Sequence, residues 1–304
     1  MEILNLQIEI FLLLFIGYIL SKLGLFSKTT RAQLTSITLS VILPAAIIES
    51  FDMDLTFEVF QSTIIVLVVS LCIQILYFIF NKFLYNKYPS DKKINLKYST
   101  MVSNAGFMGM PIAQATFGNT GLLYASIFLI PQRIFMWSEG LSLYTTVSKK
   151  DLVKNVLTHP CIIALFIGVI VMCLRMVGIT MPAALDNTIQ AVANCNTAIS
   201  MIVIGGILSD VTPKEFIDVD AFYYSLIRLI LLPIIIFIIV RLIGISPLAA
   251  NVCVLLSAMP AASTSAMLAQ KYEVNPEFAS KLVFVSTLLS LITIPLITII
   301  LKTF

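Results

Sequence analysis

The sequence predicts an all-α membrane protein whose ten transmembrane helices form two inverted five-helix repeats. Three observations predict it: few charged residues, ten apolar runs long enough to cross a bilayer, and an interruption in both the fourth and the ninth run. The 304 residues include 19 basic and 16 acidic side chains, so 12% are charged, against about 25% in soluble domains. Because so few charges cannot cover a soluble surface, we exclude a soluble enzyme, a disordered chain and a nucleic-acid binder.

Ten apolar runs have the length that a membrane helix needs, which is about 20 residues for a hydrocarbon core of ~30 Å. Breaks of Pro, Gly and charged residues separate them. The runs cover residues 6–24, 32–51, 59–84, 97–117, 121–147, 157–178, 186–208, 218–243, 247–270 and 276–302. They leave only short connections and no room for a separate soluble domain. The first run lacks a basic segment before it, so we expect a retained helix rather than a cleaved signal peptide.

Basic residues gather in the connections that follow the odd-numbered runs. Those connections hold 13 Lys and Arg residues, whereas 3 lie near the opposite side. The positive-inside rule therefore places both termini on the extracytoplasmic side of the cell membrane. The acidic residues Asp52, Asp54 and Glu58 then also lie outside, as an alternation of ten helices requires.

The two halves of the chain, residues 1–147 and 157–304, resemble each other, and residues 148–156 form a short cytosolic connection between them. The first run contains FIGYILSKLGLF at 15–26, and the sixth contains FIGVIVMCLRMVGI at 166–179. The fourth and ninth runs align at a constant offset of 156. Because five is odd, the second half enters the membrane from the opposite side, an architecture common among secondary transporters. Chance similarity between Leu- and Ile-rich helices is the alternative.

The fourth and ninth runs each contain a stretch of poor helix formers. Residues 103–111 read SNAGFMGMP, and residues 257–265 read SAMPAASTS. Pro lacks an amide donor, Gly weakens helices, and hydroxyls compete for backbone groups. Non-helical backbone is tolerated in a membrane only inside protein or beside a watery cavity. The paired breaks therefore predict a crossover site where half-helix N-termini face a bound anion. A Pro kink or tight Gly packing is the alternative.

These breaks resemble those of the auxin efflux carrier family. That family includes plant auxin exporters and bacterial permeases of the malate or malonate type, and its fold is similar to that of bile-acid:sodium symporters. The resemblance rests on SNAGFMGMP at 103–111 with Phe117-Gly118, on Trp137 to Gly140, and on MPAASTSAMLAQKYEVNPEFASKLVFVSTLLSLITIP at 259–295. It covers essentially the whole chain.

The resemblance implies a scaffold domain of helices 1, 2, 6 and 7 and a transport domain of helices 3–5 and 8–10. It also implies that helices 4 and 9 cross at the substrate site, that access alternates by an elevator-like movement, and that two copies form a homodimer. The substrate would be a small organic anion, such as malate, malonate or an auxin-like acid. Asn104 matches the family's Asn at the helix 4 crossover, which lies near bound substrate.

We expect substrate contacts from both breaks and from the two glutamines that follow them. The expected residues are Ser103, Asn104, Ala105, Gly106, Pro111, Gln114, Pro260, Ala261, Ser263, Thr264 and Gln270. Plant members have Pro at the position of Ser103 and Lys at those of Gln114 and Gln270, and these departures argue against auxin itself. Sodium-coupled relatives use an acidic residue in the ninth helix, and residues 247–270 contain none. Na⁺ and H⁺ both stay open as coupling ions.

Four charged residues within the runs are functional candidates, because ionisable groups are costly in a membrane. They are Arg133, Glu139, Arg228 and Lys281. Arg133 and Glu139 are six residues apart, about 120° from eclipsed on a helix, so they cannot form a simple intrahelical pair. We expect Arg133 either to attract an anionic substrate or to hold a structural partner. Lys281 is expected to extend toward the cytosolic face.

No motif of a metal site, a cofactor site or an enzyme is visible. The cysteines (Cys72, Cys161, Cys173, Cys195 and Cys253) are interpreted as free buried thiols, and the single histidine, His159, as an interfacial cap residue. Gly205-Gly206 is expected to allow close helix packing. There is no GxxxxGK[ST] motif, so ATP is not the direct energy source. The leading hypothesis is a secondary or facilitative transporter. The alternative is a membrane-embedded sensor that binds the same ligand without transport.

Overall fold

The protein is all-helical in the computed structural model, which describes residues 2–52, 56–146, 148–209 and 218–303. Two residues used for orientation, Asp54 and Lys214, lie outside the described residues. The α-helices are α1 Glu2–Lys22, α2 Lys28–Ile37, α3 Leu43–Ser50, α4 Phe57–Phe80, α5 Ser90–Met101, α6 Met110–Phe135, α7 Lys149–Leu157, α8 Pro160–Met176, α9 Ala183–Ala193, α10 Cys195–Leu208, α11 Val219–Leu226, α12 Leu232–Ile243, α13 Pro247–Ser257, α14 Ser263–Lys271 and α15 Pro276–Thr303.

Short π-helical segments join several of these helices into longer ones. They are η1 Thr38–Ile42, η2 Ala105–Gly109, η3 Met136–Gly140 and η5 Ile227–Leu231. Among the described residues, five segments are long and apolar enough to cross a bilayer: Lys28–Ser50, Phe57–Phe80, Ala183–Leu208, Val219–Ile243 and Pro276–Leu301. Helices α8 and α13 are apolar but shorter. The all-α membrane class predicted from composition is therefore confirmed.

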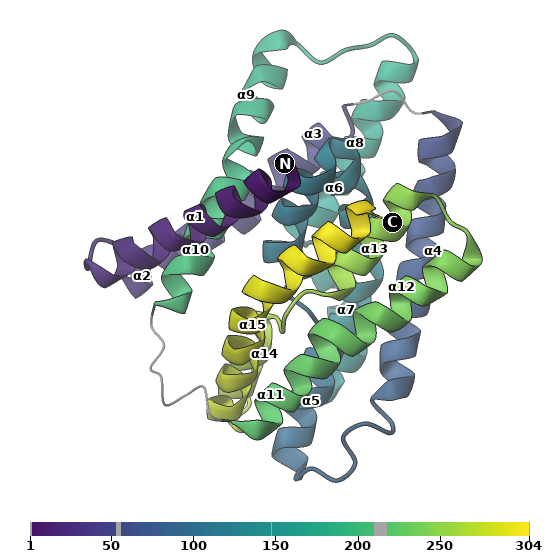
Figure 1. The fold of residues 1–304 in the computed structure, drawn as a ribbon. Coiled ribbons are helices and arrows are strands. Elements are labelled where there is room, and N and C mark those ends of the chain that lie inside the picture. The colour runs from purple at the N-terminus through teal and green to yellow at the C-terminus, as the bar shows by residue number, and fades with distance from the viewer. Residues whose placement is uncertain (1, 53–55, 147, 210–217, 304) are drawn as a thin grey trace.

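Helices α1 and α10 pack backbone to backbone at one side of the molecule (Figure 1). A β-carbon added to Gly17 would overlap the carbonyl of Ile202, and one added to Gly205 would overlap the carbonyl of Leu14. Glycine is thus required at both contact points, as is usual where membrane helices approach closely. The prediction of close packing at Gly205-Gly206 is confirmed.

Helix α8 makes a similar close contact with the end of α3. A β-carbon on Gly168 would overlap the ring of Phe51, which is buried directly after α3. Gly168 ends the Phe-Ile-Gly triplet of the sixth run, and Gly17 ends the Phe-Ile-Gly triplet of the first run. The two repeated triplets therefore each place a glycine at a helix contact.

Two helices meet at Gly118 within the segment labelled α6. Gly118 has φ 68° and ψ −162°, a backbone conformation that is not helical and that L side chains rarely adopt. The sequence predicts a connection between residues 117 and 121, and the bend lies there.

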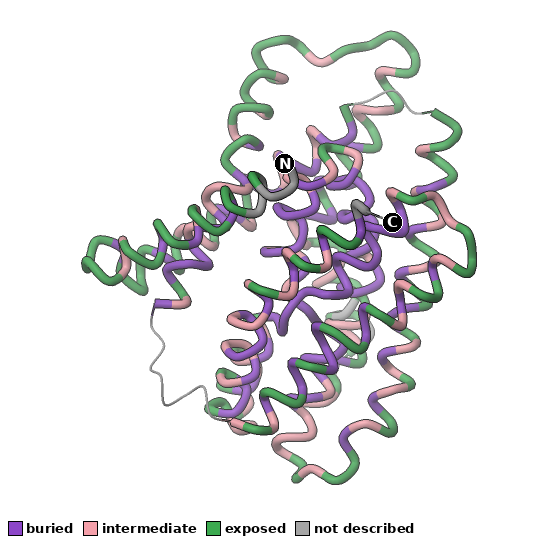
Figure 2. The backbone as a smooth tube through the Cα atoms, viewed as in Figure 1, coloured by how far each residue is buried: buried purple, intermediate pink, exposed green. Residues whose placement is uncertain are grey.

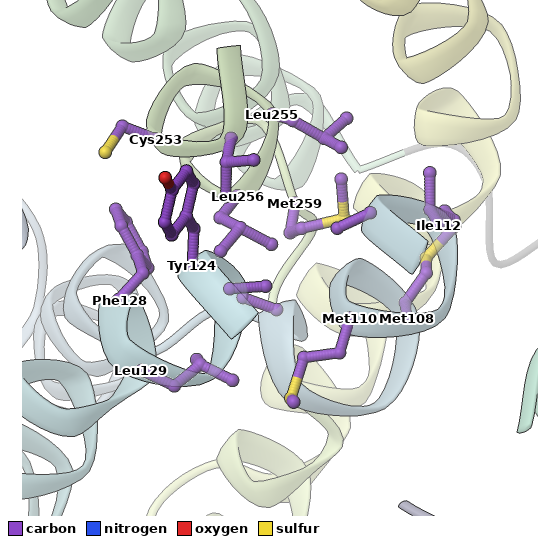
Figure 3. Packing of buried hydrophobic residues seen from close by; sticks show 14 of the residues in the cluster. Met108, Met110, Ile112, Tyr124, Phe128, Leu129, Cys253, Leu255, Leu256 and Met259 are labelled. Carbon is purple, nitrogen blue, oxygen red and sulfur yellow. The ribbon is translucent and has the colours of Figure 1, made fainter. Parts of the chain in front are cut away.

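The core lies where α6 and α13 meet in the middle of the molecule. Figure 2 shows buried backbone along these helices and exposed faces along the outer ones. In Figure 3, Met108, Met110 and Ile112 approach the end of α13 from one part of the chain, and Tyr124, Phe128 and Leu129 from another. Leu255 and Leu256 near the end of α13, and Met259 just beyond it, are all fully buried. This core encloses the segments on which the site depends.

The cysteines are free, as predicted, but only Cys161 and Cys253 are buried. The prediction of buried thiols is wrong for Cys72, Cys173 and Cys195, which are exposed. Their helices are apolar on the outside too, because that surface faces lipid rather than water, so an apolar run does not indicate burial inside the protein.

Candidate functional site

Two non-helical segments lie side by side in the middle of the molecule. Helix α5 ends at Met101 and helix α13 ends at Ser257. Beyond these ends, Ser103 and Ala261 form an antiparallel bridge. The amide of Asn104 donates to the carbonyl oxygen of Pro260 at 2.8 Å. The amide of Ala262 donates to the carbonyl oxygen of Val102 at 3.3 Å.

The local sequence explains why the helices stop and restart here. Pro260 has no amide hydrogen to donate. Its carbonyl oxygen accepts the hydrogen bond from the Asn104 amide. Asn104 has φ −76° and ψ 32°, outside the helical region. Ala262 is extended, with φ −73° and ψ 143°, before α14 begins. Pro111 is the second residue of α6 and follows the π-helical segment η2 directly, so the turn that contains it lacks the amide donor that proline does not have.

The carbonyl groups left at the two helix ends are bound by side chains from α11 and η5. The hydroxyl of Tyr224 donates to Ser99 O at 2.7 Å. Arg228 donates from Nη1 to Thr100 O and from Nε to Met259 O, both at 3.0 Å. A helix end leaves unsatisfied carbonyls, which are costly in lipid. Side chains of the segment formed by α11 and η5 thus bind carbonyl oxygens at the ends of both α5 and α13.

Within the first break, Ser103 O accepts from Nε2 of Gln132 at 2.8 Å, while the Ser103 hydroxyl donates to Oε1 of the same side chain at 3.1 Å. Gln132 is buried within α6. The Gln132 amide thus donates to the carbonyl and accepts from the hydroxyl of the same residue, Ser103. These two bonds hold the first break against α6.

A cavity of about 750 Å³ lies next to the two breaks. Its walls come from the start of α2, from η2, from the end of α10, and from α14 and α15. The lining residues are Lys28, Asn104, Phe107, Ile204, Ile207, Leu208, Ser263, Ala266, Met267, Glu277, Ser280, Lys281, Val283, Phe284 and Thr287. This volume is in the range of small-molecule sites, which combine an apolar lining with a few polar groups.

The charged groups of this cavity lie on α15 and at the start of α2. Nζ of Lys281 is 2.7 Å from Oε1 of Glu277, one helical turn away. The Lys281 side chain is 27% exposed and the Glu277 side chain 80% exposed. Lys28, the first residue of α2, also lines the cavity. An ammonium group therefore faces the cavity, held by a carboxylate that is itself accessible.

The expected substrate-binding residues divide into four groups. Asn104 and Ser263 line the cavity. The backbone of the breaks comprises Ser103, Ala105, Pro260 and Ala261, all of which are buried.

Thr264, Gly106 and Pro111 lie near the breaks without lining the cavity. Thr264 Oγ1 accepts from the hydroxyl of Tyr98 at 3.1 Å. A β-carbon on Gly106 would lie 3.8 Å from Nη2 of Arg133. Pro111 O accepts from Thr197 Oγ1 at 3.3 Å.

The two glutamines lie apart from the cavity. Gln114 accepts a hydrogen bond from Nδ2 of Asn196 on α10 at 3.0 Å. Gln270 is exposed near the end of α14. The structure therefore does not bring these two side chains together with Asn104.

The charged candidates also separate. Arg133 is buried, and its Nη1 lies 2.6 Å from Nε2 of His159. Glu139 is exposed on η3. His159 precedes α8, and its Nδ1 accepts from the amide of Cys161 at 3.3 Å, which confirms its interpretation as a cap residue. Arg228 lies at the breaks and Lys281 in the cavity wall.

Sequence reasoning missed Gln132 and Tyr224. Gln132 is a polar residue inside an apolar run, which is by itself a signal of a helix contact. Tyr224 precedes Arg228 by four residues, so the two side chains share one helix face. From that spacing one could have predicted that both side chains contact the same neighbouring segment.

A second groove, of about 700 Å³, lies between α4 and α12. Its lining is mainly aliphatic, with Ile64, Val68, Ile239 and Ile243 among its residues, and it also includes Glu58, Gln61, Ser62 and Ser246. Several of the aliphatic residues are exposed on the outer surface, so most of the groove suits lipid chains.

Comparison with known proteins gives consistent matches along the chain. The model of a family described as "Membrane transport protein" matches residues 3–159 and 143–298. An uncharacterized transporter of Methanothermobacter thermautotrophicus is 24% identical over 296 residues, covering 95% of each chain. The uncharacterized transporter YfdV of Escherichia coli is 24% identical over 300 residues, covering 95% of this chain and 94% of its own. A Rhizobium meliloti protein named "Putative malonate transporter" is 22% identical over 304 residues, covering 96% and 94%.

Proposed function

Because the chain belongs to the membrane transport protein family, as its resemblance to the auxin efflux carriers predicts, we propose that it is a secondary or facilitative transporter of a small organic anion. A carboxylate of the malate or malonate type fits best, and an auxin-like acid is the second candidate. The observation that carries the proposal is the pairing of two interrupted helices, through Asn104 and Pro260, beside a cavity of about 750 Å³. The malonate named for one relative supports the substrate class.

In this proposal the chain has ten spans in two inverted repeats. Span 4 is α5, η2 and the part of α6 before Gly118, and span 9 is α13 with α14, each interrupted at the crossover. The helix contacts support this arrangement. The first span packs through Gly17 on the seventh, and the sixth packs through Gly168 on the end of the second. Exchanging the halves converts one contact into the other, as an inverted repeat requires.

The cavity has groups suited to a carboxylate. Asn104 and Ser263 offer an amide and a hydroxyl at the breaks, and the N-terminus of α14 directs its positive dipole end toward the same region. Lys281 supplies a cationic group for a charge-assisted hydrogen bond. Apolar residues of α10 and α15 cover the rest, so a short aliphatic acid matches the lining.

The cavity walls also support an elevator-like mechanism. One wall comes from α2 and α10, which belong to the proposed scaffold of spans 1, 2, 6 and 7. The other comes from η2, α14 and α15, which belong to the proposed transport domain. Lys28, Leu208 and Glu277 adjoin connections on the Lys-rich side, so the cavity opens toward the cytosol if both termini are outside. A homodimer is the expectation from the family resemblance.

A thermal-shift screen of the purified protein tests the ligand class, because a ligand that binds the folded state raises its melting temperature. Malonate, malate and an indole carboxylate are compared with uncharged amides of the same acids. We expect the carboxylates alone to stabilise the protein. Stabilisation by the amides to the same extent, or by none of the acids, would contradict the proposal. A sensor would bind the same ligands, so the uptake measurement described in the Discussion distinguishes a transporter from a sensor.

A further inference from the structure

Arg228 is a charged side chain in the middle of an apolar membrane segment. Its side chain is 1% exposed, and it lies in η5 within the span Val219–Ile243. The guanidinium carbon lies 4.9 Å from the centroid of the Tyr77 ring, a cation–π distance. Its two hydrogen bonds go to the carbonyls of Thr100 and Met259. No described carboxylate forms an ion pair with it.

A buried charge without a counter-charge costs several kcal/mol, so the two helix ends must supply the compensation. Thr100 lies in the last turn of α5, and Met259 follows the last residue of α13 by two. The C-terminal end of a helix carries roughly half a negative charge. Two such ends directed at one guanidinium therefore offer roughly one unit of negative charge to one positive group.

Coupling cations occupy comparable places in transporters with interrupted helices, where half-helix C-termini and unwound carbonyls bind Na⁺. Here these carbonyls already bind a cation that belongs to the chain. We propose that Arg228 is a resident cation that takes the place of a coupling metal ion at the crossover. The protein then binds and moves its anion without bound Na⁺. This inference rests on the proposed transport function, but its first test does not need the substrate.

The first test measures the melting temperature of the purified protein while NaCl replaces KCl at constant ionic strength. We expect no specific effect of Na⁺ on the wild type. In Arg228→Ala the carbonyls of Thr100 and Met259 lose their donor and face an emptied space. We expect Na⁺ to raise the melting temperature of this variant by about 2 °C or more when it saturates the site. Arg228→Lys retains the charge and should stay insensitive to Na⁺.

Arg175→Met is the matched control, because Arg175 pairs with Asp52 on the outer side, away from the crossover. This variant should show no response to Na⁺. Specific stabilisation of the wild type by Na⁺ would overturn the proposal, since a metal-ion site would then exist beside Arg228. A folded Arg228→Ala without a Na⁺ response would also overturn it. If Arg228→Ala does not fold, the wild type and Arg228→Lys decide the matter.

The second test measures uptake into proteoliposomes in Na⁺, K⁺ and choline media. We expect equal rates in the three media. A requirement for Na⁺ would contradict the resident-cation proposal while leaving the transport function intact. Absence of uptake in every medium would instead contradict the transport function, and the melting experiment would still test Arg228.

Discussion

Asn104 has two roles, one for its backbone and one for its side chain. Its backbone amide binds the carbonyl of Pro260 at 2.8 Å and holds the two breaks together. Its side chain contributes to the cavity wall. A substitution that keeps the backbone therefore separates folding from recognition.

We expect Asn104→Ala to keep the fold and to weaken anion binding. Loss of one hydrogen bond to a carboxylate costs about 1.5–3 kcal/mol, which corresponds to a rise of about tenfold to a hundredfold in Kd. Ligand titrations followed by melting temperature measure the change. Asn86→Ala is the matched control, because Asn86 is exposed and its side chain donates to the nearby carbonyl oxygen of Lys82. Unchanged affinity in Asn104→Ala would remove this side chain from the site.

Lys281 and Glu277 form an ion pair on the cavity wall, at a nitrogen–oxygen distance of 2.7 Å. A bound carboxylate competes with Glu277 for the same ammonium group. We expect Glu277→Gln to raise the affinity for malonate and Lys281→Met to lower it, both measured as Kd. Lys87→Met, in an exposed connection, serves as the control. Equal affinities in both variants would show that Lys281 does not contact the ligand.

At the scale of elements, much of the architecture could be predicted from the sequence. The run 59–84 corresponds to α4 at Phe57–Phe80, and the stretch 257–265 contains the end of α13 and the start of α14. These assignments depend on local composition, because Pro, Gly and charge interrupt apolar runs wherever they occur. The contacts of Arg228 could not be predicted in this way. Its two carbonyl partners lie 128 and 31 residues away along the chain, and no periodic pattern reports such distances.

The cavity was also predictable only in part. The break motifs indicate Asn104 and Ser263, but the wall from α10 and α15 depends on how the two halves pack. Gln114 and Gln270 occupy equivalent sequence positions after the breaks, yet Gln114 binds Asn196 and Gln270 is exposed. Equivalent positions in the proposed repeat thus do not ensure a shared site.

The close contact of α1 with α10 gives a prediction about stability. We expect Gly205→Ala to destabilise the protein by about 1–3 kcal/mol, because the added methyl group overlaps the carbonyl of Leu14 and the helices must separate. Gly106→Ala is the control for stability, since a β-carbon there meets its nearest atoms at 3.8 Å. Melting temperatures compare the two variants. A Gly205→Ala protein as stable as the wild type would contradict the close packing.

The connection before α15 is tied to the first turn of α5. Asn275 has a positive φ of 44°, and its Nδ2 donates to Oδ2 of Asp91 at 2.6 Å. This bond, together with the backbone amide of Lys92, lowers the pKa of Asp91 below its ordinary value of 3.8. A lowered pKa contributes stability that is fully present above the ordinary value and is lost as the pH falls through the folded-state value.

We expect Asp91→Asn to remove this part of the acid sensitivity. Because Asp91 is partly exposed, the effect is about 1 kcal/mol or less. Melting temperatures between pH 6 and the acid limit of the protein measure it, with Asp151→Asn on α7 as the control. A steeper acid loss in Asp91→Asn than in the wild type would contradict the assigned bond.

At the scale of the whole molecule, the two non-helical segments meet in one small region, while residues 1–147 and 157–304 also pack together through α1 with α10, α3 with α8 and α6 with α13. Ser103 and Ala261 pair with each other between the ends of α5 and α13, and Arg228 of η5 binds a carbonyl oxygen at each of these ends. The cavity then lies between the elements of the proposed scaffold and those of the proposed transport domain. Substrate recognition and movement of one domain against the other would thus share a single surface.

Uptake of radiolabelled malonate into proteoliposomes tests this account most directly. Wild-type protein, Asn104→Ala and Asn86→Ala are reconstituted at equal density, and unlabelled malonate inside the vesicles supplies an exchange partner. We expect saturable uptake by the wild type and by Asn86→Ala, competition by other short carboxylates, and a large loss in Asn104→Ala. Folded wild-type protein that binds malonate without moving it would favour the sensor, and movement unaffected by Asn104→Ala would contradict the crossover as the substrate site.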